Sequence, residues 1–301
     1  MGAVLKPAPS PLRVRLAGYV ALTKPRIIEL LLITTVPTMV VAQGGMPSLW
    51  LMVATVVGGT FAAGGANAIN MYVDRDIDAL MERTKDRPLV TGVITPRAAL
   101  TFAIGLEVVA FFWLWGFVNL LSAALAVAAC LFYVFVYTLW LKRTSKSNIV
   151  IGGAAGAMPV LIGWSAVTNS LAWAPVVLFA VIFYWTPPHF WALAIKYKDD
   201  YSAADVPMLP SVVSLRSTAT RILLYTLLLW GLTLVFSPVA GMGDIYLGSA
   251  IVLGGAFTWF AVKLLRDPTT KRAMKVFTYS ITYITLLFGA MAVDVLVRSA
   301  R

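Results

Sequence analysis

The chain has 301 residues, of which 60% are hydrophobic and 12% are charged, and its formal net charge is +11. A soluble domain of this length needs more polar surface, and several apolar runs approach the roughly 20 residues that cross a bilayer as a helix. These runs do not alternate, which excludes a transmembrane barrel. With one cysteine and one histidine, the chain forms neither an intramolecular disulfide nor a metal site with several His ligands.

Apolar stretches in chain order predict an all-α fold, a multispanning transmembrane bundle of about nine helices. The predicted spans are 27–43, 49–71, 98–117, 120–140, 149–168, 172–194, 221–238, 246–265 and 275–297. Residues 1–26 are predicted to be a basic cytoplasmic arm, because no signal-peptide cleavage pattern precedes the first span. Residues 27–301 are predicted to be a single transmembrane domain, since no Pro/Ser linker divides them.

The positions of the basic residues favour a cytoplasmic N-terminus. With this orientation Lys and Arg gather in the arm and in the loops after the second, fourth, sixth and eighth spans, while only Arg298 and Arg301 fall outside. Cytoplasmic loops of membrane proteins carry this excess of basic residues. Membrane topology therefore accounts for the net charge, and no nucleic-acid partner is expected.

A polar, acidic segment follows the second span. Asn70, Asp74 and Asp78 are four residues apart, and each step of four drifts only about 40° around a helix, so their side chains share one face. Asp76 points elsewhere. Stacked carboxylate and amide oxygens suit Mg²⁺, a hard ion that bridges to substrate phosphates. The spacing therefore predicts a magnesium–diphosphate site.

Basic side chains continue this segment. Arg83 and Arg87 are four residues apart, with Lys85 between them, and guanidinium groups bind phosphate oxygens in pairs. The mixture of acids and bases favours a metal–diphosphate ligand over either charge alone. The alternative interpretation is a solvated loop whose charges pair with one another.

A second acidic segment follows the sixth span. Asp199 and Asp200 lie beside Lys196 and Lys198, and two acidic clusters that face one cavity could hold two ions on a diphosphate. Asp205 shares a helical face poorly with Asp200, so a solvated position is favoured for it.

His189 lies near the inner end of the sixth span. Three functions suit it, namely an axial ligand to a porphyrin iron, a proton-transfer group or a diphosphate contact, and the alternative is a hydrogen-bonded packing residue. Before the fifth span, Lys142, Arg143 and Asn148 could reach a ligand at the inner face. The Gly-rich run 152–164 favours close helix packing over a phosphate loop.

Three acidic residues fall within predicted spans, namely Glu29, Glu107 and Asp294. A charged group in lipid is costly, so each is by default a functional hypothesis. Asp294 is near an outer end and can instead reach water.

Taken together, these motifs resemble the intramembrane prenyltransferase superfamily, and within it most closely the heme O synthase family. The resembling stretches are 22–37, 74–92, 148–159, 187–195, 199–210 and 279–283. The resemblance implies an enzyme that transfers a farnesyl group from farnesyl diphosphate to a vinyl group of heme B, with addition of water. The products are heme O and diphosphate, and Mg²⁺ is required.

The resemblance also implies roles for individual residues. The expected catalytic residues are Asn70, Asp74, Asp78 and Asp200. The expected Mg²⁺ ligands are Asp74, Asp78, Asp199 and Asp200. The expected substrate-binding residues are Arg83, Lys85, Arg87, Lys142, Arg143, Asn148, His189, Lys196 and Lys198. The second acidic motif departs from the superfamily pattern, because Ala204 stands four residues after Asp200.

The missing transit-like presequence favours a bacterial plasma membrane, and the predicted topology places the active site on its cytoplasmic side. Implied partners are heme B, farnesyl diphosphate, the lipid bilayer and heme A synthase or terminal-oxidase assembly. Three alternatives stay open: a prenyltransferase with a quinone-precursor acceptor, a transporter that couples to cations through Asp74 or Glu107, and a non-catalytic heme-binding assembly protein.

Overall fold

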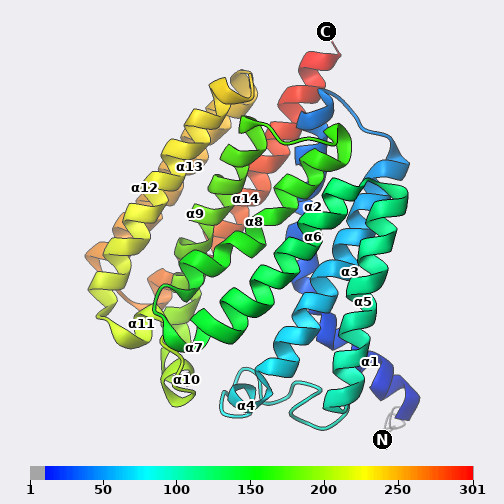
Figure 1. Cartoon of the computed structure of the whole chain (residues 1–301). Helices are drawn as coiled ribbons and strands as arrows, with labels where there is room; N and C mark the ends of the chain where they lie inside the picture. The colour runs from blue at the N-terminus through cyan, green and yellow to red at the C-terminus, as the bar shows by residue number, and fades with distance from the viewer. Residues whose placement is uncertain (1–10, 301) are drawn as a thin grey trace, which may run out of the picture.

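The computed structural model describes residues 11–300, without the side chains of residues 26–32, so the expectation for Glu29 lies outside the described residues. Within this range the fold is entirely helical, as predicted (Figure 1). The long helices are α2 (Pro25–Gln43), α3 (Leu49–Val73), α5 (Pro96–Phe117), α6 (Leu120–Leu131), α8 (Asn148–Thr168), α9 (Trp173–Lys196), α12 (Leu215–Val239), α13 (Asp244–Arg266) and α14 (Thr270–Ser299). The shorter elements are α1 (Pro11–Thr23), α4 (Arg75–Asp78), the π-helix η1 (Phe132–Leu141), α7 (Lys142–Thr144), α10 (Lys198–Ala203) and α11 (Leu209–Val212).

In the part of the chain that the structure describes, eight helical stretches are long and apolar enough to cross a membrane. They are Leu49–Val73, Pro96–Phe117, Leu120–Thr144, Asn148–Thr168, Trp173–Lys196, Leu215–Val239, Asp244–Arg266 and Thr270–Ser299. These match the second to ninth predicted spans and confirm a multispanning bundle. In α2, the described part Ile33–Gln43 is a shorter apolar helix, so the count of nine and the orientation of the N-terminus stay predictions.

Half of the predicted N-terminal arm is the helix α1. Its residue Leu22 is fully buried, in an apolar cluster with Ala68 and Met71 of α3 and with Leu89 and Ile94 of the following loop. Burial of a leucine side chain contributes on the order of 1.5–3 kcal/mol. Residues 11–23 are therefore held against the bundle, next to the end of α3.

Several helices begin at a polar side chain that accepts a backbone N–H bond, the usual way to satisfy the first amides of a helix. Ser48 begins α3, Thr95 begins α5 and Asn119 begins α6 in this manner. Ser214 and Thr269 do the same for α12 and α14. The helices α3, α5 and α6 thus begin within about two residues of the predicted spans, whereas α12 and α14 begin five or six residues earlier than predicted.

Small residues allow close helix contacts at two places that position the site. A Cβ atom at Gly163 in α8 would lie 2.8 Å from the Thr35 carbonyl oxygen of α2. A Cβ atom at Gly65 in α3 would lie 2.6 Å from the Glu107 carboxylate of α5. The Gly-rich run in α8 is therefore a packing surface, as the sequence favoured.

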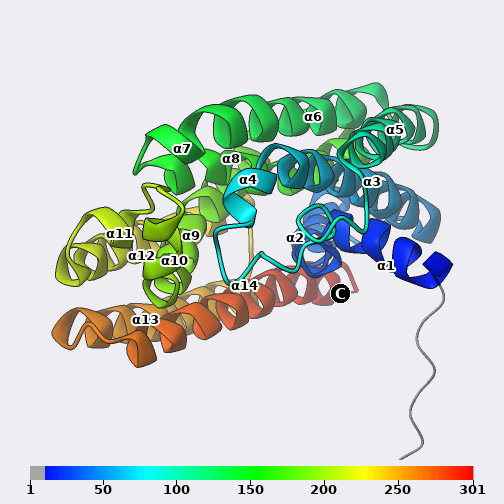
Figure 2. The same ribbon diagram turned by 90° about the horizontal axis from the view of Figure 1, so that it is seen from below.

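The largest apolar core joins α8, α9, α12, α13 and α14. The inner ends of α3 and α9 lead to the short helices α4 and α10, which lie at the same end of the bundle in both views (Figures 1 and 2). The two acidic segments predicted from the sequence are therefore carried to one end of the molecule.

Candidate active site

The first acidic motif lies where α3 ends and α4 begins. The backbone N–H of Asp74 donates to the Asn70 carbonyl at 2.9 Å, and that of Asp78 donates to the Asp74 carbonyl at 2.8 Å, so helical spacing continues through the junction. Asn70, Asp74 and Asp78 are all buried. The Asn70 amide donates to the Asp74 carboxylate at 2.7 Å, which brings two of the three side chains into direct contact.

Cationic side chains from two later segments contact these buried carboxylates. Lys142 forms an ion pair with Asp74, and Arg143 lies 3.8 Å from the other Asp74 oxygen. Arg87 pairs with Asp78 at 2.6 Å. Buried charges require such partners, since removing one partner leaves a costly uncompensated charge. The structure therefore gathers three of the predicted substrate-binding cations around the motif.

Asp76 is oriented away from this cluster, as the helical spacing predicts. Its side chain is 61% exposed and accepts two hydrogen bonds of 2.7 Å from Arg143. The bond from Arg143 lowers the pKa of Asp76 to about 2. Arg143 thus connects the exposed carboxylate with the buried site.

Lys24 is a site residue that the sequence analysis placed in the basic arm. It joins α1 to α2 in a left-handed backbone conformation, with φ of 51°, and its ammonium group donates to the Asn70 side-chain oxygen at 2.9 Å. Burial, then the nearby Arg87 and Lys142 charges, lower the Lys24 pKa to about 7. A negatively charged ligand beside it would favour the protonated form. In the sequence, the position of Lys24 next to a proline at the start of a span was the feature that could have indicated it.

The π-helix η1 supplies a second group that sequence periodicity did not indicate. Thr138 accepts a hydrogen bond from Asn70 at 3.2 Å and donates to the Tyr133 carbonyl at 2.8 Å. Tyr133 and Tyr137 stack with ring centroids 5.4 Å apart, and Tyr133 packs against an apolar cluster that includes Ala66 of α3. Local π-helix in an α-helix is often found at functional sites.

The second acidic segment meets the loop that follows the first. The Asp200 carboxylate accepts a bond of 3.4 Å from the Arg83 backbone N–H, and the Arg83 guanidinium lies 5.7 Å from the centre of the Tyr197 ring. Below them, Ile77 and Met81 form an apolar cluster whose other members are Tyr201, Ala204 and Val206. Asp200 and Arg83 are therefore brought to the predicted site.

Other predicted site residues lie on the surface. Asp199, Lys196 and Lys198 are exposed, and Lys85 pairs with Glu82 at 2.5 Å, which raises the Lys85 pKa. Asp205 is also exposed. Within residues 11–300, no three His, Cys, Asp or Glu side chains gather closely enough to form a metal site on their own.

His189 is fixed between α9 and α14. Its ring stacks on Trp185 at 4.3 Å and lies 4.7 Å from Phe277. Its Nδ1 atom is 2.7 Å from the Ser280 hydroxyl, which donates to the Phe277 carbonyl at 2.6 Å.

Asn148 is fully buried, and its amide donates to the Lys142 carbonyl at 3.4 Å.

The two described acids within spans differ in role. Asp294 accepts backbone N–H bonds from Gly243 at 2.7 Å and Tyr246 at 3.3 Å, which caps the beginning of α13. This is a structural role. Glu107 lies against Gly65 with one carboxylate oxygen buried and without a hydrogen-bond partner among the described residues.

The chain matches the family model described as the UbiA prenyltransferase family over residues 31–288. It belongs to this family. A protoheme IX farnesyltransferase of Frankia casuarinae is 56% identical over 287 residues, covering 93% of this chain and 98% of its own length. A protoheme IX farnesyltransferase of Clavibacter sepedonicus is 52% identical over 282 residues, covering 92% of each chain.

Solved structures of UbiA-type proteins share the fold. The structure described for digeranylgeranylglyceryl phosphate synthase in membranes has a TM-score of 0.77 and 18% identity, covering 94% of this chain and 99% of that chain. A UbiA homolog from Archaeoglobus fulgidus bound to DMAPP and Mg²⁺ has a TM-score of 0.60 and 16% identity, covering 91% and 99%. The helical arrangement of this UbiA-family chain is thus an established one.

The residues of this UbiA-family site fit a magnesium ion. One oxygen of Asp74 is buried and has no hydrogen-bond partner among the described residues, and Asp78 and the Asn70 amide lie on the same helical face. Mg²⁺ takes oxygen ligands, binds one or two carboxylates and completes its shell with water and phosphate oxygens. Two buried carboxylates with adjacent cations supply that donor set.

Proposed function

We propose that this chain transfers a farnesyl group from farnesyl diphosphate to a vinyl group of heme B, with addition of water, to give heme O and diphosphate. The observation that supports it most strongly is the identity of 52–56% with protoheme IX farnesyltransferases over at least 92% of the chain. The buried cluster of acids and bases at the end of α3 supplies the chemistry that a diphosphate substrate requires.

In the proposed first step, the bond between carbon 1 of the farnesyl group and the diphosphate oxygen breaks, and the electron pair leaves with the diphosphate. Asp74 and Asp78 would hold Mg²⁺, which neutralises the leaving group when bound. Lys24, Arg87 and Lys142 donate to the phosphate oxygens as their charge grows. Fixed charges aimed at a developing anion lower the barrier most effectively in a site that excludes water.

In the proposed second step, the vinyl π electrons of heme B form the new bond to the farnesyl carbon. The cation then lies beside the porphyrin ring, and water adds to it and loses a proton. An allylic cation must not meet bulk water before this bond forms. The stacked rings of Tyr133 and Tyr137 lie on η1, whose Thr138 contacts Asn70, and would restrict water there.

The remaining predicted residues complete the proposal. Asp200 and Arg83 would act on the second side of the diphosphate, since their segment touches the first loop. Lys85, Lys196, Lys198 and Asp199 would take part only after the exposed loops close on the substrate. Arg143, Asn148 and His189 would contact substrate from α7, α8 and α9.

We also place the protein in a bacterial plasma membrane, with the site on the cytoplasmic side. The support is the distribution of Lys and Arg, which concentrates at the end of the bundle that holds Asp74. Farnesyl diphosphate and Mg²⁺ would enter from that side. Heme O, the product, would pass to heme A synthase or to proteins that assemble a terminal oxidase.

The experiment adds heme B, farnesyl diphosphate and Mg²⁺ to membranes that contain the chain and separates the heme pigments by chromatography. We expect heme O with the native chain and none with Asp74→Ala, which removes a metal ligand. Asp205→Asn, an exposed acid outside the cluster, is the matched control and should retain activity. Prenylation of a quinone precursor instead of heme B would disprove the proposed acceptor.

A further inference from the structure

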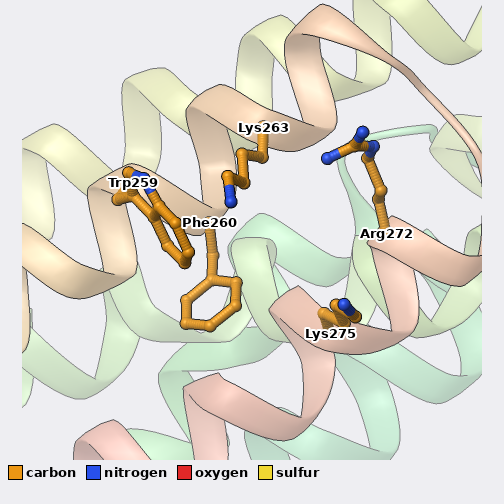
Figure 3. A pocket seen from close by; sticks show the side chains of 5 residues that line it. All are labelled: Trp259, Phe260, Lys263, Arg272 and Lys275. Carbon is orange, nitrogen blue, oxygen red and sulfur yellow. The ribbon is translucent and has the colours of Figure 1, made fainter.

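A small pocket lies between the end of α13 and the beginning of α14 (Figure 3). Trp259, Phe260 and Lys263 line it from α13, and Arg272 and Lys275 line it from α14. The cavity measures about 70 Å³, several times the roughly 10–15 Å³ that holds one water on the same measure. That space admits a phosphate-sized group.

The pocket carries excess positive charge. The Lys263 ammonium lies 3.5 Å from the centre of the Trp259 ring, and Arg272 uses its Nε atom to pair with Asp267 at 2.7 Å. Neither Lys263 nor Lys275 forms an ion pair with another residue in the part of the chain that the structure describes. Three cations thus face a cavity with no carboxylate in its lining.

One wall of the pocket continues along a membrane-facing surface. Trp259 is 52% exposed, and Ile251 and Val252, which are 49% and 69% exposed, precede it by eight and seven residues on α13. Residues seven or eight apart share one face of a helix. The exposed apolar face therefore begins at the cationic pocket and extends about 10 Å along α13.

We propose that this pocket binds the phosphate of an anionic phospholipid of the bilayer, whose acyl chains lie along the Val252–Trp259 face of α13. Lys263, Arg272 and Lys275 supply the charge-assisted hydrogen bonds that phosphate oxygens accept. Basic pockets between helices at a membrane surface bind lipid head groups, and tryptophan is enriched at that depth. The absence of carboxylates in its lining separates this site from the metal–diphosphate site.

The test uses the purified full-length chain and native mass spectrometry after exposure to mixed phosphatidylglycerol and phosphatidylcholine. We expect retained phosphatidylglycerol, with affinity reduced about tenfold or more in the double variant Lys263→Gln, Lys275→Gln. The charge-matched control Arg266→Gln, Lys271→Gln alters two exposed cations of the same turn that do not line the pocket, and it should retain the lipid. Lys263→Arg, Lys275→Arg preserves the charge and should restore binding, which separates lost binding from lost folding.

Three results would overturn the proposal. Equal retention of the two lipids by the native chain would show that no anionic head group is recognised, and equal loss in both double Gln variants would show a diffuse charge effect. A third arm adds inorganic phosphate at concentrations up to those of the lipid. If it displaces all phosphatidylglycerol at concentrations near those of the lipid, the site binds free anions and the lipid assignment fails.

Discussion

Asp74 and Asp76 are two residues apart in sequence, yet their carboxylates meet different surroundings. Asp74 is fully buried, accepts a hydrogen bond from Asn70 and forms an ion pair with Lys142. Asp76 is mostly exposed and pairs with Arg143. An exposed pair is typically worth below 1 kcal/mol, while loss of a buried partner costs several times more. We therefore expect substitution of Asp74 to destabilise the fold more than substitution of Asp76.

Lys24 is expected to contribute to diphosphate binding. Its ammonium contacts Asn70 beside the acidic motif, and a charge-assisted hydrogen bond contributes about 1.5–3 kcal/mol. Lys24→Met should therefore raise the KM for farnesyl diphosphate about 10- to 100-fold, and Lys24→Arg should retain part of the affinity. Steady-state kinetics in membranes would measure this.

The control for Lys24 is Arg15→Gln, which alters an exposed cation on α1 outside the site. It should leave the KM unchanged. A native KM in Lys24→Met would remove Lys24 from the site.

At the scale of elements, the π-helix η1 brings residues that are five positions apart onto one face. Thr138 donates to the carbonyl of Tyr133, five residues earlier, and the Lys142 backbone N–H bonds to the Tyr137 carbonyl. A π-helix closes its turn over five residues rather than four. Residues that would diverge on an α-helix therefore face α3 together, and the end of this segment delivers Lys142 to Asp74.

The Asp294 side chain supports the start of α13, and its loss should destabilise the fold. Asp294→Ala leaves the Gly243 and Tyr246 amides without their acceptor, and lost caps and buried bonds of this kind cost about 1–3 kcal/mol. The melting temperature in detergent should fall, with little change in activity per folded molecule. Asp244→Ala, an exposed acid in the same turn, should change it much less, and equal shifts would contradict the cap.

Helix spacing alone predicted the shared face of Asn70, Asp74 and Asp78, because that relation is local. The same reasoning could not find Thr138, since its contact with Asn70 joins residues 68 positions apart and depends on how η1 packs against α3. Lys24 was assigned to a basic arm because topology explained its charge equally well. The contact between Asp200 and Arg83 joins residues 117 positions apart, and only the folded chain reveals it.

At the scale of the whole molecule, one end of the bundle collects both acidic segments and most of the cations, while the opposite connections are nearly uncharged. Spans that alternate in direction place the α8–α9 connection at the end opposite the α13–α14 turn (Figure 1). The basic end would be retained on the cytoplasmic side. The sequence predicts this orientation, and the accessibility of single cysteines from each side of the membrane tests it.

Labelling of single cysteines would give that measurement, because the only native cysteine, Cys130, is buried. A membrane-impermeant maleimide added to intact cells should modify Ser170→Cys in the α8–α9 connection. It should modify Thr270→Cys at the start of α14 only after the cells are opened. Both positions are exposed, and the reverse pattern would invert the proposed topology.

The contact between His189 and Ser280 also bears on which ring nitrogen of His189 carries the proton. A serine hydroxyl has one hydrogen, so when Ser280 donates it to the Phe277 carbonyl, the 2.7 Å contact is made by the Nδ1–H group of His189. The neutral imidazole is therefore held as a single tautomer, with the lone pair on Nε2. That is the form in which a histidine binds a metal ion, with the other nitrogen donating to a neighbouring acceptor. Two helices thus prepare the ring of the one histidine in this chain as a Lewis base.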